Sequence, residues 1–403
     1  MKTLAVLGTL DTKGAEHAFI ADFIRQRGHG VVLIDVGTST PPTVTPDITR
    51  EQVAAAADID LATLIAHQDR GECVVAISKA APILVAKLAA EGKIHGIISL
   101  GGGGGTAIGT AAMRGLPFGF PKIMVSTLAS GNTAHYVGEK DITMIPSIAD
   151  VAGLNRITRT IFTRAAGALC GMVEAEIPVP ENDRQLIAAS MFGNTTQCVD
   201  HAREIIDAAG YETLVFHSTG TGGKTMESLI ADGLITGVLD ITTTEWADEL
   251  VGGTLTAGPT RLDATAKAGI PAIVVPGCLD MVNFGARETV PDKFNGRNFY
   301  IHNPQVTLMR TSAEECAELG KILAEKVNSY TAPVTVIIPL KAISIISAKG
   351  QPFHDPEADH ALFTSLKENL TPSIPVIEMD TSINDPAFSK ACAETLLNHL
   401  KPQ

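Results

Sequence analysis

Short runs of apolar residues recur along the chain, and longer stretches with spaced apolar positions separate them. The first two runs are residues 4–7 and 31–36, and a stretch with helical character at about 15–27 lies between them. Continuous apolar runs of this length are typical of strands buried on both faces of a sheet. The strand–helix–strand order predicts a right-handed βαβ unit. Because the order repeats to the C-terminus, we predict an α/β fold built on open parallel sheets with helices on both faces.

The same pattern occurs twice. Residues 186–196 resemble residues 4–13, and the later apolar runs follow in matching order. A segment with prolines and polar residues, 177–184, interrupts the pattern and is typical of a linker. We therefore predict two Rossmann-like parallel-sheet subdomains, 1–180 and 185–403, with a ligand cleft between them. The other predicted strands are 95–100, 121–127, 142–145, 213–217, 237–243, 271–277, 334–338 and 375–379, the other predicted helices are 50–69, 80–91, 150–170, 197–209, 361–369 and 386–400, and 73–77 fits either type.

The most unusual stretch is a glycine run directly after the strand at 95–100. It consists of Gly101, Gly102, Gly103, Gly104 and Gly105, and Thr106 follows it. We predict a bare loop that opens a helix near Thr106, so that backbone N–H groups at a positive helix end can hold a phosphate. The alternative is a flexible loop without a ligand. The run is not a P-loop, because no Lys-Ser or Lys-Thr follows at the required distance.

Other polar and small residues follow the predicted strands, at the edge of the sheet where doubly wound folds bind ligands. A second small-residue turn, 218–225, lies between a strand and a helix and is another candidate anion site; the alternative is a purely structural turn. The candidate nucleotide-binding residues outside the glycine run are Thr9, Asp11, Thr12, Lys13, Thr127, Ser130, Gly131, Asn132, Asn194, Gly220, Thr221 and Gly222.

Two carboxylates are candidate metal ligands. Asp11 and Asp280 both follow predicted strands, and Mg²⁺ prefers one or two carboxylates together with phosphate oxygens and water. Asp11 is equally well suited to cap the following helix. Lys13 could pair with a phosphate or remain a solvated surface residue.

Two further groups of ionisable residues are candidates for acid–base or metal chemistry. Glu245, Asp248 and Glu249 form an acidic cluster on a predicted helix, and we interpret it as a solvated face. His354 and Asp355 could take part in acid–base or metal chemistry, but a hydrogen-bonded loop fits as well. No motif of a covalent nucleophile stands out, and no catalytic residue is predicted.

The composition limits the functional classes. The 403 residues are 45% hydrophobic but only 4% aromatic, which suits large aliphatic cores. The formal net charge of −13 argues against broad binding to nucleic acids or anionic membranes. Six scattered cysteines give no zinc-knuckle spacing and make a disulfide framework improbable. The chain begins with a predicted strand rather than a signal peptide, and no apolar run reaches about 18 residues, so we expect a cytoplasmic protein.

Four motifs resemble an uncharacterised protein family (UPF) that includes the N-terminal, ATP-binding half of the tomato mosaic virus resistance protein Tm. They are Leu7–Gly14, Ser99–Thr106, Ser126–Gly131, and Gly350–Phe353 with Asp355. The resemblance covers essentially the whole chain. It implies two Rossmann-like subdomains, ATP with Mg²⁺ in the cleft between them, and self-association as a homodimer. In the plant protein this domain binds a viral replication protein, a partner that need not carry over, and the plant protein's C-terminal barrel has no counterpart in this chain.

Together these features predict an ATP-binding protein, with phosphoryl or nucleotidyl chemistry on a small metabolite if it is an enzyme. The resemblance fixes no reaction, so the enzymatic question stays open. One alternative is a non-catalytic nucleotide-sensing module that controls a protein partner. Another is an NAD-dependent oxidoreductase, which expects an acidic residue at the end of the second strand; Asp35 lies there but follows the wrong glycine loop.

Overall fold

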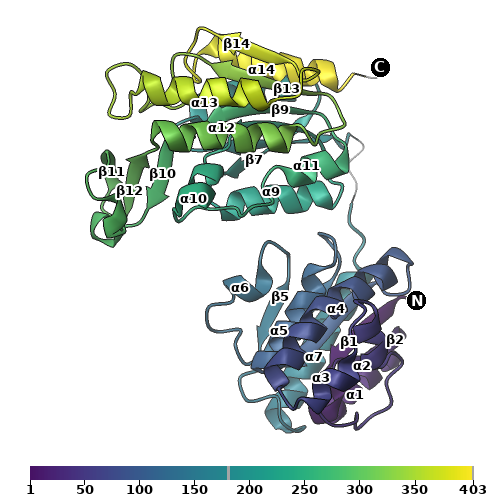
Figure 1. Ribbon diagram of the computed structural model, residues 1–403. Coiled ribbons are helices and arrows are strands. Elements are labelled where there is room, and N and C mark those ends of the chain that lie inside the picture. The colour runs from purple at the N-terminus through teal and green to yellow at the C-terminus, as the bar shows by residue number, and fades with distance from the viewer. Residues whose placement is uncertain (179–181, 402–403) are drawn as a thin grey trace. The chain divides into compact units, whose positions relative to one another are not determined.

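The computed structural model describes residues 1–178 and 182–401 (Figure 1). It divides into two compact units, Met1–Val179 and Pro180–Gln403. The centre of the predicted linker, 179–181, lies outside the described residues. Each unit is described below by itself.

The N-terminal unit is a five-stranded parallel sheet in the order β2-β1-β3-β4-β5. Its strands are β1 (Thr3–Gly8), β2 (Gly30–Asp35), β3 (Gly96–Gly101), β4 (Lys122–Ser126) and β5 (Thr143–Pro146). Its helices are α1 (Leu10–Gln26), α2 (Arg50–Ala55), α3 (Leu61–Ala66), α4 (Arg70–Ala90), α5 (Gly103–Arg114), α6 (Ala134–Val137) and α7 (Arg156–Glu174). Helices α1 and α7 bury their apolar residues in one core cluster, and α2, α4 and α5 bury theirs in another. The two clusters take alternate residues of the strands, as expected of a sheet covered on both faces.

The C-terminal unit repeats this plan with one more strand, in the order β14-β13-β9-β8-β6-β7, and all pairs are parallel. The strands are β6 (Leu186–Met191), β7 (Glu212–His217), β8 (Ile235–Thr242), β9 (Ala272–Gly277), β13 (Val334–Pro339) and β14 (Val376–Met379). Around them lie α8 (Thr196–Ala208), α9 (Thr221–Ala231), α10 (Glu245–Val251), α11 (Asp263–Ala268), α12 (Ala313–Val327), α13 (Pro356–Asn369) and α14 (Pro386–His399), with 3-10 helices at Arg287–Thr289 and Asp292–Phe294. A separate antiparallel sheet, β10-β12-β11, consists of β10 (Met281–Phe284), β12 (Val306–Arg310) and β11 (Phe299–Asn303).

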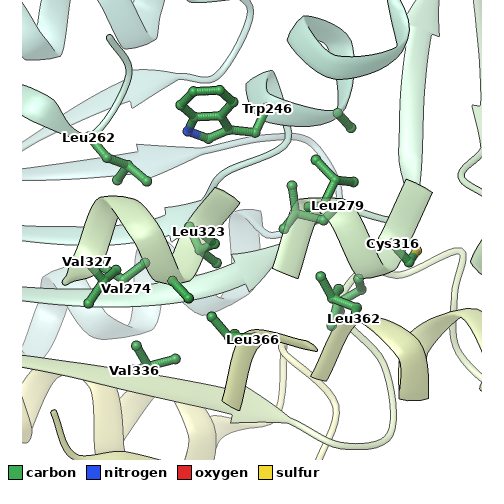
Figure 2. Packing of buried hydrophobic residues seen from close by; sticks show 14 of the residues in the cluster. Trp246, Leu262, Val274, Leu279, Cys316, Leu323, Val327, Val336, Leu362 and Leu366 are labelled. Atoms are coloured by element: carbon green, nitrogen blue, oxygen red, sulfur yellow. The ribbon is translucent and has the colours of Figure 1, made fainter. Parts of the chain in front are cut away.

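The largest apolar core of the C-terminal unit lies between its six-stranded parallel sheet and helices α12 and α13. Figure 2 shows Leu323 and Val327 of α12 close to Val274 of β9, with Leu362 and Leu366 of α13 beside them. Trp246, the only tryptophan of the sequence, is buried at the edge of the same cluster. Its fluorescence therefore reports on the folding of this unit.

The predicted fold class, two Rossmann-like parallel sheets, is confirmed, and the strand order is the same over the shared strands. Matching the two orders from the first strand makes β1 equivalent to β6, β2 to β7, β3 to β8 and β4 to β9. The helices that follow β3 and β8, α5 and α10, are then equivalent as well. In both units the order reverses next to the first strand, which is where doubly wound folds leave a crevice for ligands.

Several local predictions were wrong. Helix α1 begins at Leu10 and not near residue 15, and residues 50–69 form two short helices. The segment 73–77, which fitted either type, belongs to helix α4. Helix α4 is also long and apolar enough to cross a membrane by length and composition, contrary to the prediction that no such run exists. The core helix of a globular unit passes the same test, and α4 buries Ala76, Ile77 and Val85 against its own unit.

The glycine run is not a bare loop. Gly101 ends β3, Gly102 is the N-cap residue, and Gly103 already begins α5. The turn is this tight because Gly101 has no side chain: a Cβ there would lie 2.7 Å from the Cα atom of Gly105. The chain therefore passes from strand to helix within a single residue.

Candidate functional site

The segment Gly101–Thr106, called the glycine turn below, lies at the carboxyl end of β3, next to the point where the strand order reverses. In an α-helix the first N–H groups have no helical carbonyl partner and carry the positive end of the helix dipole. In α5 these groups belong to three glycines, and the N–H of Thr106 is the first that donates back, to the carbonyl oxygen of Gly102 at 2.8 Å. The turn thus presents backbone donors without side chains around them.

Steric requirements explain only one of the five glycines. A Cβ added to Gly103 would find no heavy atom within 4 Å, and one added to Gly102, Gly104 or Gly105 would meet nothing closer than 3.4 Å. Only Gly101 needs to be glycine for the protein's own packing. Each glycine in ordered helical structure costs about 0.5–1 kcal/mol relative to alanine. Packing within the protein does not account for this cost at the other four glycines, and their lack of side chains leaves the backbone N–H groups accessible to a ligand.

A basic side chain stands beside the turn. Arg70 is the first residue of α4, and its Nη2 atom lies 3.6 Å from the position of a Cβ on Gly104. Within the described part of the chain, its guanidinium has no ion pair or hydrogen bond. Sequence reasoning missed Arg70. A signal was available, because a cation in the first turn of a helix opposes the helix dipole and is unfavourable unless an anion compensates it.

Two cavities flank the glycine turn. One of about 290 Å³ is lined by Arg70 and by Thr38 and Ser39, which follow β2. The other, of about 380 Å³, is lined by Thr127 and Ser130, which follow β4. The Thr127 Oγ1 atom lies 3.8 Å from the position of a Cβ on Gly102.

The predicted residues after β4 divide into two groups. Thr127 and Ser130 line the second cavity and lie near the turn. Gly131 and Asn132 instead serve their own loop, because the Gly131 N–H donates to the Leu128 carbonyl and Asn132 Oδ1 accepts from the Ala134 N–H.

A buried hydroxyl pair fixes the turn against the sheet. The Oγ1 atom of Thr106 and the Oγ atom of Ser126 lie 2.7 Å apart, and both residues are fully buried. Ser126 Oγ also accepts from the N–H of Leu128 at 2.9 Å. The first turn of α5 is therefore tied to the end of β4, which holds the backbone donors in one arrangement.

The residues predicted after β1 form the start of α1. Asp11 Oδ2 accepts from the N–H groups of Thr38 and Ser39 at 3.1 and 3.0 Å and from Ser39 Oγ at 3.1 Å. Asp11 is therefore neither a free metal ligand nor the cap of α1: it holds the loop after β2. Thr9, Thr12 and Lys13 lie in the same turn, where the Oγ1 atoms of Thr9 and Thr12 are 3.3 Å apart and Lys13 departs from helical geometry.

Asp35 ends β2, as a ribose-binding acid would in a dinucleotide fold. Its carboxylate is only 1% exposed, and Oδ1 accepts from the N–H groups of Leu10 at 3.1 Å and Gly37 at 2.8 Å. Burial raises the pKa of Asp35 against these hydrogen bonds. Oδ1 is thus engaged within the unit, while Oδ2 is buried without a partner among the described residues, and the near-complete burial of Asp35 argues against a ribose at this carboxylate.

The second predicted anion site is filled by the protein itself. The N–H groups of Gly220 and Gly223 donate to Oε1 of Glu245, at 2.8 and 3.0 Å. The other oxygen of Glu245 accepts from Nε of Arg261 at 2.7 Å. A carboxylate therefore already occupies the Gly220 donor of this predicted phosphate site, while the assignment of Thr221 and Gly222 stays a prediction.

The acidic cluster on α10 is not a solvated face. Glu245 and Asp248 are each 1% exposed. Arg261, which is also buried, pairs with Glu245, with Asp240 at 2.6 Å and with Glu227 at 3.2 Å. This network joins three elements of the C-terminal unit, and the solvated interpretation of Glu245 and Asp248 was wrong.

Asp280 does not present a metal site either. It is fully buried, Oδ2 accepts from Ser344 Oγ at 2.7 Å, and desolvation raises its pKa to about 6 although Arg310 favours the charged form. Over residues 1–178 and 182–401, no three His, Cys, Asp or Glu side chains are grouped to hold a metal ion.

The segment at His354 and Asp355 acts as a loop clamp. His354 Nδ1 lies 3.2 Å from the Ser347 carbonyl oxygen, and Asp355 caps α13 by accepting from the N–H of Ala358 at 3.1 Å.

Comparisons with known proteins agree with the motifs. Residues 2–178 match the N-terminal domain, and residues 184–400 the C-terminal domain, of the uncharacterised protein family UPF0261. The chain belongs to this family. A UPF0261 protein of Clostridium tetani is 49% identical over 401 residues, covering 99% of each chain. The ToMV resistance protein Tm-1(GCR237) of Solanum lycopersicum is 36% identical over 413 residues, covering 97% of this chain and 55% of that protein.

Solved structures add little to this assignment. A putative UDP-N-acetylglucosamine 2-epimerase from Listeria monocytogenes matches with a TM-score of 0.23 and 11% identity, over 68% of this chain and 78% of that one. The UDP-N-acetylglucosamine 2-epimerase from Neisseria meningitidis matches with a TM-score of 0.24 and 10% identity, over 99% and 100%. Scores this low carry no argument about ligand or reaction.

Proposed function

We propose that the protein binds the phosphate groups of ATP at the glycine turn of its N-terminal unit, with Arg70 as the charged partner. The observation that carries the proposal is a difference between equivalent positions of the two units. Glu245 is the first residue of α10, and its side chain satisfies backbone donors at the start of α9. The first residue of the equivalent helix α5 is Gly103, which has no side chain and faces open space.

The C-terminal unit thus supplies a carboxylate to backbone donors at a helix start, whereas no side chain of the described residues covers the start of α5. The acid nearest Arg70 in sequence, Asp69, lines the same cavity and caps α4 through the N–H of Glu72. The neighbouring Arg70 sits at the start of α4, in the segment that follows β2 as α9 follows β7. A phosphate group would satisfy both the exposed N–H groups of α5 and the guanidinium, which bonds phosphate oxygens in a planar fork. The resemblance to the family that includes the plant ATP-binding domain makes ATP the first nucleotide to test.

The chain's own carboxylates argue for Mg²⁺ entering with the nucleotide rather than being held in advance. Asp11 is engaged by backbone donors and Asp280 is buried. Mg²⁺ bound mainly through phosphate oxygens and water needs no preformed cage of protein ligands. Whether ATP is also consumed, in phosphoryl or nucleotidyl transfer, is a separate question that turnover assays decide.

Substitutions at Gly103 test the proposal directly. The Gly103→Glu change adds a carboxylate at the start of α5, as Glu245 does at the start of α10, and Gly103→Val adds uncharged bulk. Both should abolish ATP·Mg²⁺ binding in equilibrium dialysis. Without nucleotide, Gly103→Glu should raise the free energy of unfolding by about 1 kcal/mol, more than Gly103→Val does, because a carboxylate in the first turn also interacts favourably with the helix dipole. Because a Cβ at this position meets nothing, neither change should disturb the fold.

Arg70→Ala should weaken ATP binding about tenfold or more, the value of a hydrogen-bonded charge pair. The matched control is Gly171→Val, since Gly171 lies in α7 and a Cβ there also meets nothing within 4 Å. It should bind ATP like the wild type. The proposal is refuted if wild-type protein binds no ATP, or if Gly103→Glu binds it with unchanged affinity.

A further inference from the structure

The C-terminal unit contains a cavity of about 440 Å³ that the nucleotide proposal does not use. It lies beyond the carboxyl ends of β6 and β7, where Phe192, Gly193 and His217 line it. Two strands of the antiparallel sheet, β11 and β12, close it from another side through Tyr300 and Leu308. A parallel sheet, a second sheet and a loop thus enclose one space, of a size typical for small-molecule sites.

Most of the cavity wall is apolar or aromatic. Phe192, Tyr300, Leu308 and Ile346 belong to one small apolar cluster, in which the rings of Tyr300 and Phe353 meet edge to face with centroids 6.4 Å apart. Ile345 lines the cavity and is 47% exposed, which is unusual for a large aliphatic side chain. An apolar body of a ligand would cover this surface and be stabilised by it.

The polar groups of the cavity are few and uncharged or weakly basic. They are Asn194, His217 and His302, and no carboxylate, lysine or arginine lines the space. Asn194 is only 9% exposed, yet among the described residues its carboxamide makes a single interaction, from Nδ2 to the sulfur of Met281 at 3.8 Å. The Nδ2 group carries two N–H donors and the contact with the sulfur uses one, so a second donor is left for a ligand group at this position.

These groups favour a negatively charged ligand head. Imidazole and carboxamide N–H groups donate to oxygen, and donors to an ionised acceptor form the stronger hydrogen bonds. Gly193 and Asn194 also lead directly into α8, whose N-terminal end carries partial positive charge. With no carboxylate in the lining, nothing would repel an acid.

We propose that this cavity binds a small organic acid, with its aromatic or branched apolar body against Tyr300 and Leu308 and its carboxylate at Asn194, His217 and His302. All residues that line the cavity belong to the C-terminal unit. It assigns a ligand class to residues that neither the family description nor the glycine turn explains.

Ligand-observed fluorine NMR with 4-fluorobenzoate and 4-fluorophenylacetate tests the proposal on the full chain. Both should show saturable line broadening, and the neutral analogue 4-fluorophenylacetamide should bind about tenfold more weakly because it lacks the charge. Gly193→Phe should abolish binding by filling the cavity, since a Cβ on Gly193 meets no heavy atom within 4 Å. His302→Ala should weaken the acids about tenfold and the amide less.

Ile301→Ala is the matched control. Ile301 is 60% exposed, lies between Tyr300 and His302 on β11 and does not line the cavity, so its truncation should leave binding unchanged. The proposal is overturned if neither acid binds saturably, if Gly193→Phe and His302→Ala bind like the wild type, or if ATP displaces the acids, which would assign the cavity to the nucleotide. The exposed position of His302 keeps the test valid should Gly193→Phe fail to fold.

Discussion

Replacing Asp248 by asparagine should remove a large part of the pH dependence of stability in the C-terminal unit. Oδ1 of Asp248 accepts from the N–H groups of Asn283 and Leu255, and Oδ2 accepts from Asn283 Nδ2 at 2.7 Å. Despite these bonds, burial raises the pKa of Asp248 to about 7. Asn283 Oδ1 is itself buried without a partner among the described residues. A half-turn of that amide would let it accept from a protonated Asp248 or from an asparagine at this position.

The magnitude follows from linkage. Below about pH 4 both the folded and the unfolded state hold the proton, and above that pH the unfolded carboxyl ionises first. The folded state keeps its proton until about pH 7, so the free energy of unfolding falls as the pH rises from about 4 to about 7 and is level above. A difference of about three pKa units at about 1.4 kcal/mol each gives a total near 4 kcal/mol.

Urea unfolding followed by the fluorescence of Trp246 measures the free energy of unfolding of the C-terminal unit, which contains both Trp246 and Asp248. Between pH 4 and 7.5 the Asp248→Asn variant should gain about 4 kcal/mol relative to the wild type, because it lacks the titrating group. Glu394→Gln, which removes an exposed carboxylate of α14, is the control and should run parallel to the wild type. If the difference between Asp248→Asn and the wild type stays constant with pH, the carboxyl is not held protonated and the reasoning fails.

Three further changes test the packing described above. Gly101→Ala should destabilise the N-terminal unit strongly, because its Cβ would lie 2.7 Å from backbone atoms, whereas Gly103→Ala should stabilise it by about 0.5–1 kcal/mol; thermal unfolding monitored by circular dichroism compares them. Glu245→Ala should lower the free energy of unfolding by about 2–4 kcal/mol, since it removes one of the three carboxylate partners of Arg261 and leaves the buried N–H groups of Gly220 and Gly223 unsatisfied; a loss below about 1 kcal/mol would contradict the network. Phe353→Ala empties a fully buried position and should cost about 3–5 kcal/mol in urea unfolding, and an unchanged midpoint would contradict its burial.

The strands could be predicted from the sequence because they are buried on both faces. The run 272–275 is apolar at every position and 97–100 at all but Ser99, so neither periodicity nor register had to be resolved. Helix starts were less certain. Gly8 and Gly14 suggested a loop, but Gly14 is tolerated inside α1, where a Cβ would meet Thr43 at 2.1 Å. The glycine there serves packing between helix and loop, which no local pattern reveals.

The charged groups could not be placed from the sequence. Arg261 is 16 residues from Glu245, 21 from Asp240 and 34 from Glu227, and it lies in a stretch without regular structure. Isolated acids are usually solvated, and that expectation failed for Glu245 because its neutralising partner comes from a distant segment. Arg70 was missed for a related reason. Its role at the glycine turn follows from its proximity to Gly104 in space, and the two residues are far apart in the sequence.

The internal repeat carries more functional information than either half alone. Once the strand orders are matched, α5 and α10 are equivalent helices, and the first turn contains a glutamate in α10 and glycines in α5. The glutamate neutralises a buried arginine and caps a neighbouring helix, so that helix start is closed. In the other unit Arg70 is exposed, and among the described residues no side chain lies over the start of α5. Within the described part of the chain, backbone donors without a side chain over them, beside an unpaired guanidinium, are where a phosphate gains most, and this is why the glycine turn, and not the second small-residue turn, is the site to test with nucleotide.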